Sequence, residues 1–149
     1  VASLMGIACA SMAQADPSLA TARGLDGFLS AEKLPKPQNE VLALGYDIYA
    51  DTCQNCHGGN KATGAPKVTS TKAWDKRVAK GMEVLIEHAL NGFVGPTYTQ
   101  MPARGANPDL TDKEVAAAVA YMVWLSGGSA TAAAGVCGRR RRRGRGRRG

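Results

Sequence analysis

The strongest chemical signal in this chain is the five-residue run Cys53–His57, which reads CQNCH. Two cysteines separated by two residues and followed by histidine form the pattern through which haem is attached to a polypeptide. The two thiols add to the vinyl groups of the haem, and the adjacent imidazole is then placed to bind the iron. We therefore predict one haem c, held covalently by Cys53 and Cys56, with His57 as an iron ligand.

Two other kinds of site use a cysteine pair of this spacing, namely thioredoxin-like redox sites and zinc sites. A thioredoxin-like motif lies near a βαβ pattern, and the sequence shows no such strand-rich pattern. A structural zinc ion needs about four ligands. Outside the motif, the chain offers only Cys9, His88 and Cys137 as further cysteine or histidine ligands, and both cysteines lie in terminal segments of biased composition. Haem attachment therefore explains the motif better than either alternative.

A haem held only by His57 would leave one axial position of the iron open. The candidates for that position are Met82, Met101, Met122, His88 and the lysines. Two of these methionines have the spacing of helical core residues, and the histidine falls within a predicted helix. Met101 instead stands in an irregular segment, and Pro102 stiffens the chain directly after its sulfur. We predict Met101 as the second axial ligand, with His88 as the alternative.

The choice of the second ligand decides what the iron can do. A histidine and methionine pair stabilises ferrous iron and raises the reduction potential. The same pair closes the iron to oxygen, peroxide and substrates, so that the protein moves electrons and performs little bond chemistry. An iron with an open position would favour gas binding or catalysis instead.

The elements that position these residues are helices, because apolar residues recur at spacings of three and four. Asn39 can cap a helix that begins at Glu40 and ends at Gly58, with the CQNCH motif on its last turn. Two short helices are predicted over residues 72–80 and 82–90, and a last helix begins at the capping box Thr111–Glu114 and ends before Gly127. We expect a loop rich in glycine and proline over residues 91–110, and either a short helix or an extended wrap within residues 16–38.

The two ends of the chain differ in composition from its middle. Residues 1–15 are uncharged and mostly small or apolar, and they end in an Ala-x-Ala-like cleavage signal, so they resemble the end of a secretory signal peptide. Residues 138–149 contain eight arginines, without which the formal charge of +7 would be −1. Such a run is expected to be disordered. Its functional interpretation is weak contact with an anionic membrane surface, and the alternative, which we favour, is a solvated appendage or a translation or assembly artefact at the chain end. We expect no nucleic-acid partner.

With these residues placed, the chain resembles the class I c-type cytochromes, and among them the small bacterial cytochrome c-five type with one haem. The resemblance covers about residues 39–126. The matching pieces are Gly45–Tyr49, Cys53–Gly58, Gly64–Pro66, Trp74, Arg77, Gly81, Met101–Gly105, Asp109–Asp112 and Ala116–Met122. The resemblance implies an all-α fold of about four helices, with long loops wrapped around one covalently bound haem. The chain then divides into a leader (1–15), an extension (16–38), a haem domain (39–126) and a linker with an arginine-rich tail (127–149).

The resemblance also implies roles for single residues. Pro66 is expected to supply the carbonyl that accepts the Nδ1–H of His57 and so orients the ring. Gly45 and Tyr49 are expected to cross the last helix near Tyr121, where glycine allows a close approach. The candidates to line or neutralise the haem propionates are Trp74, Arg77 and Arg104, with an ordinary surface charge as the alternative for either arginine.

The function implied is that of an exported, periplasmic electron carrier with one haem, and not an enzyme. It would accept one electron from a donor dehydrogenase or cytochrome complex and pass it to an acceptor oxidase or reductase of a respiratory chain. Contacts with these partners are expected to be small and transient, because a shuttle must release quickly. Two alternatives remain: an electron-transfer subunit of a dehydrogenase complex, or a haem enzyme or gas sensor if Met101 is not a ligand.

Overall fold

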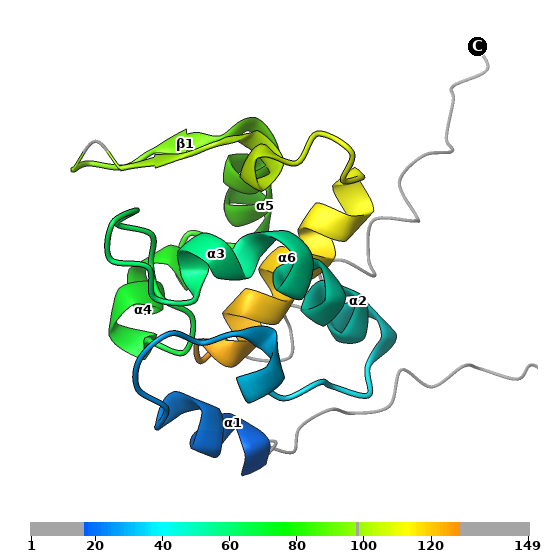
Figure 1. Cartoon of the computed structure of the whole chain (residues 1–149). Helices are drawn as coiled ribbons and strands as arrows, with labels where there is room; N and C mark the ends of the chain where they lie inside the picture. Colours follow the sequence, from blue (N-terminus) through cyan, green and yellow to red (C-terminus); the bar gives the residue numbers. More distant parts are fainter. Residues whose placement is uncertain (1–16, 98, 129–149) are drawn as a thin grey trace, which may run out of the picture.

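Helices make up nearly all of the regular secondary structure in the part of the chain that the computed structural model describes, residues 17–97 and 99–128 (Figure 1). The elements in order are α1 (Pro17–Arg23), η1 (Ala31–Lys33), α2 (Glu40–Ile48), η2 (Tyr49–Cys53), α3 (Gln54–His57), α4 (Thr71–Val78), α5 (Met82–Asn91), β1 (Phe93–Val94), β2 (Gln100–Met101), η3 (Ala103–Ala106) and α6 (Asp112–Leu125). The all-α prediction is confirmed. The leader-like segment, Cys9, Cys137 and the arginine-rich tail lie outside the described residues.

Side-chain caps explain where the predicted helices begin. The Asn39 side chain accepts hydrogen bonds from the backbone N–H groups of Val41 and Leu42, at 3.0 and 3.1 Å, and thereby starts α2. At α6 the predicted capping box is present: Glu114 donates its N–H to the Thr111 hydroxyl at 3.3 Å, and its carboxylate accepts the Thr111 N–H at 2.8 Å. Each cap satisfies backbone donors that the first helical turn leaves without partners.

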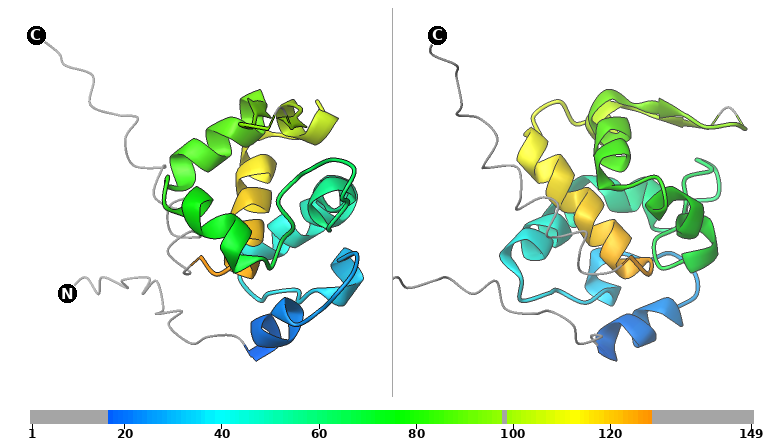
Figure 2. Two further views of the ribbon diagram at one scale, coloured as in Figure 1. Left: turned by 90° about the vertical axis from the view of Figure 1, so that its left-hand side faces the viewer. Right: turned by 180° about the vertical axis from the view of Figure 1, so that it is seen from behind.

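Helix α6 lies at the centre of the fold, with α2 and α3 on one side and α5 on the other (Figure 2). Val115 and residues 117–125 are all buried. Apolar residues spaced by three and four predict one buried face of a helix, but the buried residues of α6 extend around nearly all of it. Helices α1, α2 and α5 all contact α6, so almost its whole circumference is covered. Within the described residues, no helix is both long and apolar enough to cross a membrane.

The predicted crossing of α2 over α6 is confirmed at Gly45. A Cβ atom on Gly45 would lie 2.2 Å from the carbonyl oxygen of Ala117 and 2.7 Å from the Cβ of Tyr121, so only glycine allows the two backbones to come this close. One turn further on, the rings of Tyr49 and Tyr121 lie 5.7 Å apart between centroids. Both tyrosines are fully buried, and the contact holds the start of the haem-motif segment against α6.

Two features differ from the sequence-based expectations. The helix predicted to run unbroken to the CQNCH motif contains the π-helical turn Tyr49–Cys53 between α2 and α3. Such a turn inserts an extra residue and changes which face the following residues present. The segment 91–110, predicted as irregular loop, contains a short antiparallel hairpin in which Phe93 pairs with Met101, as well as the turn η3. Gly95-Pro96 starts the reversal of the hairpin, and the N–H of Gly95 bonds to the carbonyl of Thr99 at 2.8 Å.

The alternatives left open for residues 16–38 are also decided. Of the residues the structure describes there, 17–23 form α1, and those that follow are largely extended apart from the turn η1. This segment contributes to the core through the buried side chains of Leu19, Ala22, Leu29, Ala31 and Leu34. It is therefore part of the folded unit and not an appended tail.

Candidate haem site

The CQNCH motif spans the junction between the π-helical turn and α3. Cys53 is the last residue of η2, Cys56 lies within α3, and His57 ends α3. Residues three apart on a helix share a face, so the two cysteine side chains lie one above the other. Among the described residues there is no group of three or more His, Cys, Asp and Glu side chains that could hold a metal ion. Cys53, Cys56 and His57 therefore do not converge on a single point, as a zinc site would require.

The ring of His57 is buried and held in one orientation. Its Nδ1 lies 3.0 Å from the carbonyl oxygen of Pro66, the partner that the family resemblance implied. Donation from Nδ1 leaves Nε2 as the nitrogen with a free lone pair, which is the arrangement of metal-binding histidines. Burial lowers the pKa of His57, the nearby charge of Arg77 lowers it further, and the bond to Pro66 opposes both effects. The neutral, metal-binding form of the ring is therefore favoured.

The thiol chemistry of the chain before haem attachment does not suit a redox pair. Burial raises the pKa of Cys53 to about 12, with smaller contributions from Cys56 and Asp51. Catalytic thiols of thioredoxin-like proteins have lowered pKa values, because the thiolate is the reactive species. The structure therefore supports thioether attachment over the thioredoxin-like alternative.

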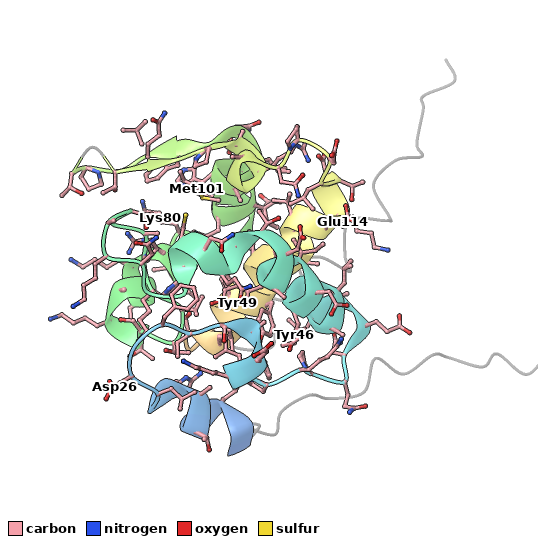
Figure 3. The ribbon with its side chains drawn as sticks, in the orientation of Figure 1. Asp26, Tyr46, Tyr49, Lys80, Met101 and Glu114 are labelled. Atoms are coloured by element: carbon pink, nitrogen blue, oxygen red, sulfur yellow. The ribbon has the colours of Figure 1, made fainter. Side chains whose placement is uncertain are left out.

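Met101 lies on strand β2, partly buried and packed against the hydrophobic core. Figure 3 shows it below the hairpin, on the side that faces α3. The hairpin packs against the loop that follows His57. Thr99 of the hairpin lies so close to Gly64 of this loop that a Cβ atom on Gly64 would lie 2.4 Å from the Cγ2 of Thr99. Gly64 and Thr99 each stand two residues before a predicted site residue, Pro66 and Met101 respectively. The two segments that carry these residues therefore touch.

The other candidates for the second axial position have different surroundings. Met122 is buried in the middle of α6, and Met82 begins α5 and is packed against the core. The His88 ring stacks on Phe93, with 4.1 Å between the ring centroids. These placements agree with packing roles for the two methionines and with a partly exposed surface position for His88.

The three candidates for the haem propionates have different partners. The indole of Trp74 is buried 6.1 Å from the His57 ring, and its N–H donates to the carbonyl of Lys67 at 2.9 Å. Arg77 bonds to the carbonyl of Ala73 on its own helix. The guanidinium of Arg104 donates to the carbonyl of Leu110 at 2.7 Å and to Asp112 at 2.6 Å. The partners of Arg104 fasten the Met101 segment to the start of α6.

Sequence reasoning missed two residues outside the expected haem domain, Leu29 and Ala31, that bond to the motif or to the glycine that follows it. The backbone N–H of Leu29 donates to the carbonyl of Gly58 at 2.7 Å, and that of Ala31 donates to the Gln54 side chain at 2.9 Å. The hydroxyl of Tyr49 donates to the carbonyl of Leu29 at 2.7 Å. The bond between Leu29 and Gly58 joins two backbone groups, and the bond between Ala31 and Gln54 joins a backbone group to a glutamine side chain. No local sequence pattern marks either of these bonds.

The donor set fits a covalently bound haem. Two cysteines lie on one helical face, a neutral imidazole with a free Nε2 follows them, and a thioether lies on a neighbouring strand that touches the Pro66 segment. When bound, a haem of this kind supplies one-electron exchange between ferrous and ferric iron. The residues of the chain orient it and limit the access of water.

Comparison with known proteins agrees with this chemistry. Residues 40–122 match the family described as "Cytochrome C oxidase, cbb3-type, subunit III". Cytochrome c-555 of Prosthecochloris aestuarii is 44% identical over 85 residues, which are 55% of this chain and 85% of the relative. Cytochrome c-555 of Chlorobaculum thiosulfatiphilum is 46% identical over 84 residues, 56% of this chain and 95% of the relative. Cytochrome c5 of Ectopseudomonas mendocina is 33% identical over 81 residues, 53% of this chain and 86% of the relative.

These matches and the site lead to one assignment. The family match covers more than half of the chain and includes the whole CQNCH motif. The related cytochromes are covered over most of their own lengths, so the similarity extends well beyond the motif. The chain belongs to the small class I c-type cytochromes, which carry a single haem c bound covalently through two cysteines, here Cys53 and Cys56.

Proposed function

We propose that this c-type cytochrome is an exported electron carrier whose single haem iron is ligated by His57 and Met101. The relatives are electron-carrier proteins and not enzymes, and their names support a carrier role in general. Our proposal adds three points to this general carrier role: the ligand pair, the periplasmic location and the transient redox partners.

The contact between Gly64 and Thr99 is the observation that carries the ligand proposal. It brings the segment of Pro66, which holds His57, against the strand of Met101. The turn after Met101 supports the same conclusion, because Arg104 ties that turn to α6 at Leu110 and Asp112. A thioether on a strand held at both ends has a defined position, which is what a weak axial ligand requires.

The residues of the chain then perform three tasks. The bond between His57 and Pro66 fixes the plane of the imidazole and increases its basicity as a ligand. Met101 would supply the second ligand of the iron and would thereby exclude oxygen, peroxide and substrates. The buried surroundings of His57 keep water from the iron on that side, which favours the ferrous form and raises the reduction potential.

Replacement of Met101 by alanine tests the ligand proposal, with Met82→Ala as the matched control. Met101→Ala should keep the covalent haem, lose the near-infrared charge-transfer band of methionine-ligated ferric iron, lower the potential, and bind CO or cyanide rapidly. Met82→Ala should leave the band and the potential close to those of the wild type, because Met82 is only partly buried at the start of α5. An unchanged spectrum for Met101→Ala would reject the ligand and favour the enzyme or gas-sensor alternative.

Export is proposed from the leader-like residues 1–15, with residues 39–126 as the haem domain and 127–149 as linker and tail. Intact mass of the protein from a periplasmic fraction, with a pyridine haemochrome spectrum, tests this division. The expected mass is that of a chain beginning near Asp16 with one haem added. A haem-free protein retaining residues 1–15 in the cytoplasm would contradict the proposal.

A second candidate function is supported by the family description, which names a subunit of an oxidase. In that case the protein would transfer electrons within a larger complex and would not be a free shuttle. Gel filtration of the native protein separates the two. A free carrier elutes at the size of one small chain, whereas a subunit co-elutes with a partner that is reduced or oxidised together with the haem.

A further inference from the structure

The segment that connects α1 to α2, residues 24–37, runs alongside the helix that carries the CQNCH motif (Figure 1). We refer to residues 24–37 as the strap. The strap precedes residues 40–122, the part of the chain that matches the cytochrome family. Its relation to the haem site is therefore a property of this chain that the family match does not describe.

Three hydrogen bonds fasten the strap around the motif. The N–H of Leu29 donates to the carbonyl of Gly58, the residue that follows the haem-binding histidine, at 2.7 Å. The N–H of Ala31 donates to the side-chain oxygen of Gln54, the first residue between the two cysteines, at 2.9 Å. The hydroxyl of Tyr49 donates to the carbonyl of Leu29 at 2.7 Å and closes the set on the other side of the motif.

The two bonds of Leu29 are buried, and the bond between Ala31 and Gln54 is partly buried. Leu29 and Tyr49 are both 0% exposed, and Ala31 is 4% exposed. Buried hydrogen bonds of this kind are costly to break, because each leaves a polar group without a partner. The strap therefore holds the two ends of the motif in place, and the two bonds of Leu29 do so away from water.

The strap also covers the end of α3 itself. A Cβ atom on Gly58 would lie 2.8 Å from a ring carbon of Phe28, so this aromatic ring packs directly on the backbone that follows His57. One residue further on, a Cβ atom on Gly59 would lie 3.4 Å from the carbonyl of Gly27. These close contacts exclude water from the side of the attachment turn that faces the strap.

We propose that the strap, acting through Gln54 as a positioning residue, holds the haem-attachment turn and shields it from water, and thereby raises the reduction potential. Ferric haem carries one more positive charge than ferrous haem, so water near the iron favours the ferric form and lowers the potential. Outer contacts that orient a metal ligand typically change affinity or activity by about 10- to 100-fold. This inference rests on the proposed carrier function with His57 as a ligand.

The test compares two substitutions inside the motif, of which only Gln54→Leu removes a bond to the strap; it also removes the side-chain N–H that donates to the carbonyl of Ala50. Gln54→Leu removes the acceptor for the N–H of Ala31 and keeps the size of the side chain, while Asn55→Leu alters the neighbouring exposed residue. The midpoint potential is measured by spectroelectrochemical titration of the haem-bound protein. We expect Gln54→Leu to lower the potential enough to change the ferrous-to-ferric ratio by about threefold or more at the wild-type midpoint. Asn55→Leu should produce a much smaller shift.

A third variant approaches the same bond from the strap. Ala31→Pro removes the N–H that donates to the Gln54 side chain. Ala31 is the first residue of η1, and the extended backbone of the preceding Ser30 (φ −68°, ψ 156°) is compatible with a following proline. It should lower the potential in the same direction, and the double variant should shift it by less than the sum of the two. Ala31→Pro also decides the question if Gln54→Leu does not retain haem.

The results of these experiments distinguish a failure of the strap proposal from a failure of the proposed carrier function. Equal potentials for wild type, Gln54→Leu and Ala31→Pro, or equal shifts for Gln54→Leu and Asn55→Leu, would overturn the role of the strap. The near-infrared band of the wild type reports methionine ligation independently of any of these variants. Absence of the band from the wild type would count against Met101 as a ligand. A shifted potential in a variant that retains the band supports the proposed role of the strap.

Discussion

Gly45→Ala should destabilise the protein strongly, because it adds one methyl group at the point where α2 and α6 touch. The new Cβ would lie 2.2 Å from the carbonyl oxygen of Ala117 and 2.7 Å from the Cβ of Tyr121. Ordinary contacts of this kind are about 3.5–4.0 Å, so the two backbones must separate by roughly 1 Å or more. A carbonyl oxygen and a Cβ are fixed to their helix and cannot move aside by rotating a side chain.

The size of the effect follows from two opposing contributions. Alanine favours a helix over glycine by about 1 kcal/mol. Overpacking of a rigid contact costs typically 1–3 kcal/mol and occasionally more, and separation of the helices also loosens the buried contact of Tyr49 with Tyr121. Because the contact is backbone against backbone, we take the upper end of the overpacking cost, and after the propensity gain we expect a net loss of about 2 kcal/mol in the free energy of unfolding.

Urea unfolding of the oxidised, haem-bound protein, followed by far-ultraviolet circular dichroism, measures this loss. Ala43→Gly, two residues earlier on α2, is the control for helix propensity alone and should cost about 1 kcal/mol. The haem spectrum of folded Gly45→Ala should remain that of the wild type, since the clash lies outside the axial ligands. A Gly45→Ala protein as stable as the wild type, or more stable, would refute the close approach of α2 and α6.

Two further substitutions test particular contacts of the fold. Tyr121→Phe removes the hydroxyl that donates to the carbonyl of Pro35 at 2.9 Å and should lower the free energy of unfolding by about 1 kcal/mol in urea; no change would mean that water replaces the bond. Glu114→Gln should destabilise the protein at neutral pH, because hydrogen bonds from Thr111 lower the pKa of the Glu114 carboxylate below its usual 4.5. A lowered pKa in the folded state adds stability that is present above 4.5 and is lost as the pH falls through the folded-state pKa, so the difference in Tm between wild type and Glu114→Gln should shrink in acid. A difference independent of pH would contradict this origin.

Much of the helical structure could be predicted because its signals are local. The caps at Asn39 and Thr111 act on backbone groups two or three residues away, and both were found where the sequence indicated them. The π-helical turn before Cys53 could not be predicted, because nothing in the residues Tyr49–Cys53 distinguishes five-residue from four-residue backbone bonding. The hairpin of Phe93 with Met101 was missed for a similar reason: strands of two residues are too short for an alternating pattern to appear.

The candidate site likewise contains residues that the local sequence predicts and contacts that it does not. The types and spacing of Cys53, Cys56 and His57 identify covalent haem attachment, because that chemistry depends on neighbouring residues of one helix. The sequence by itself therefore determined the cofactor, the family and most of the helices.

Only the tertiary structure decided which distant groups surround that motif. It brought Thr99 of the Met101 strand against Gly64, engaged Arg104 with Asp112, and wrapped Leu29 of the strap over Gly58. The contacts of Thr99 with Gly64 and of Leu29 with Gly58 join residues far apart in the chain through van der Waals fit and a backbone hydrogen bond, which carry no signature in residue type. Their formation depends on how buried surfaces pack around α6, and packing is a property of the whole fold.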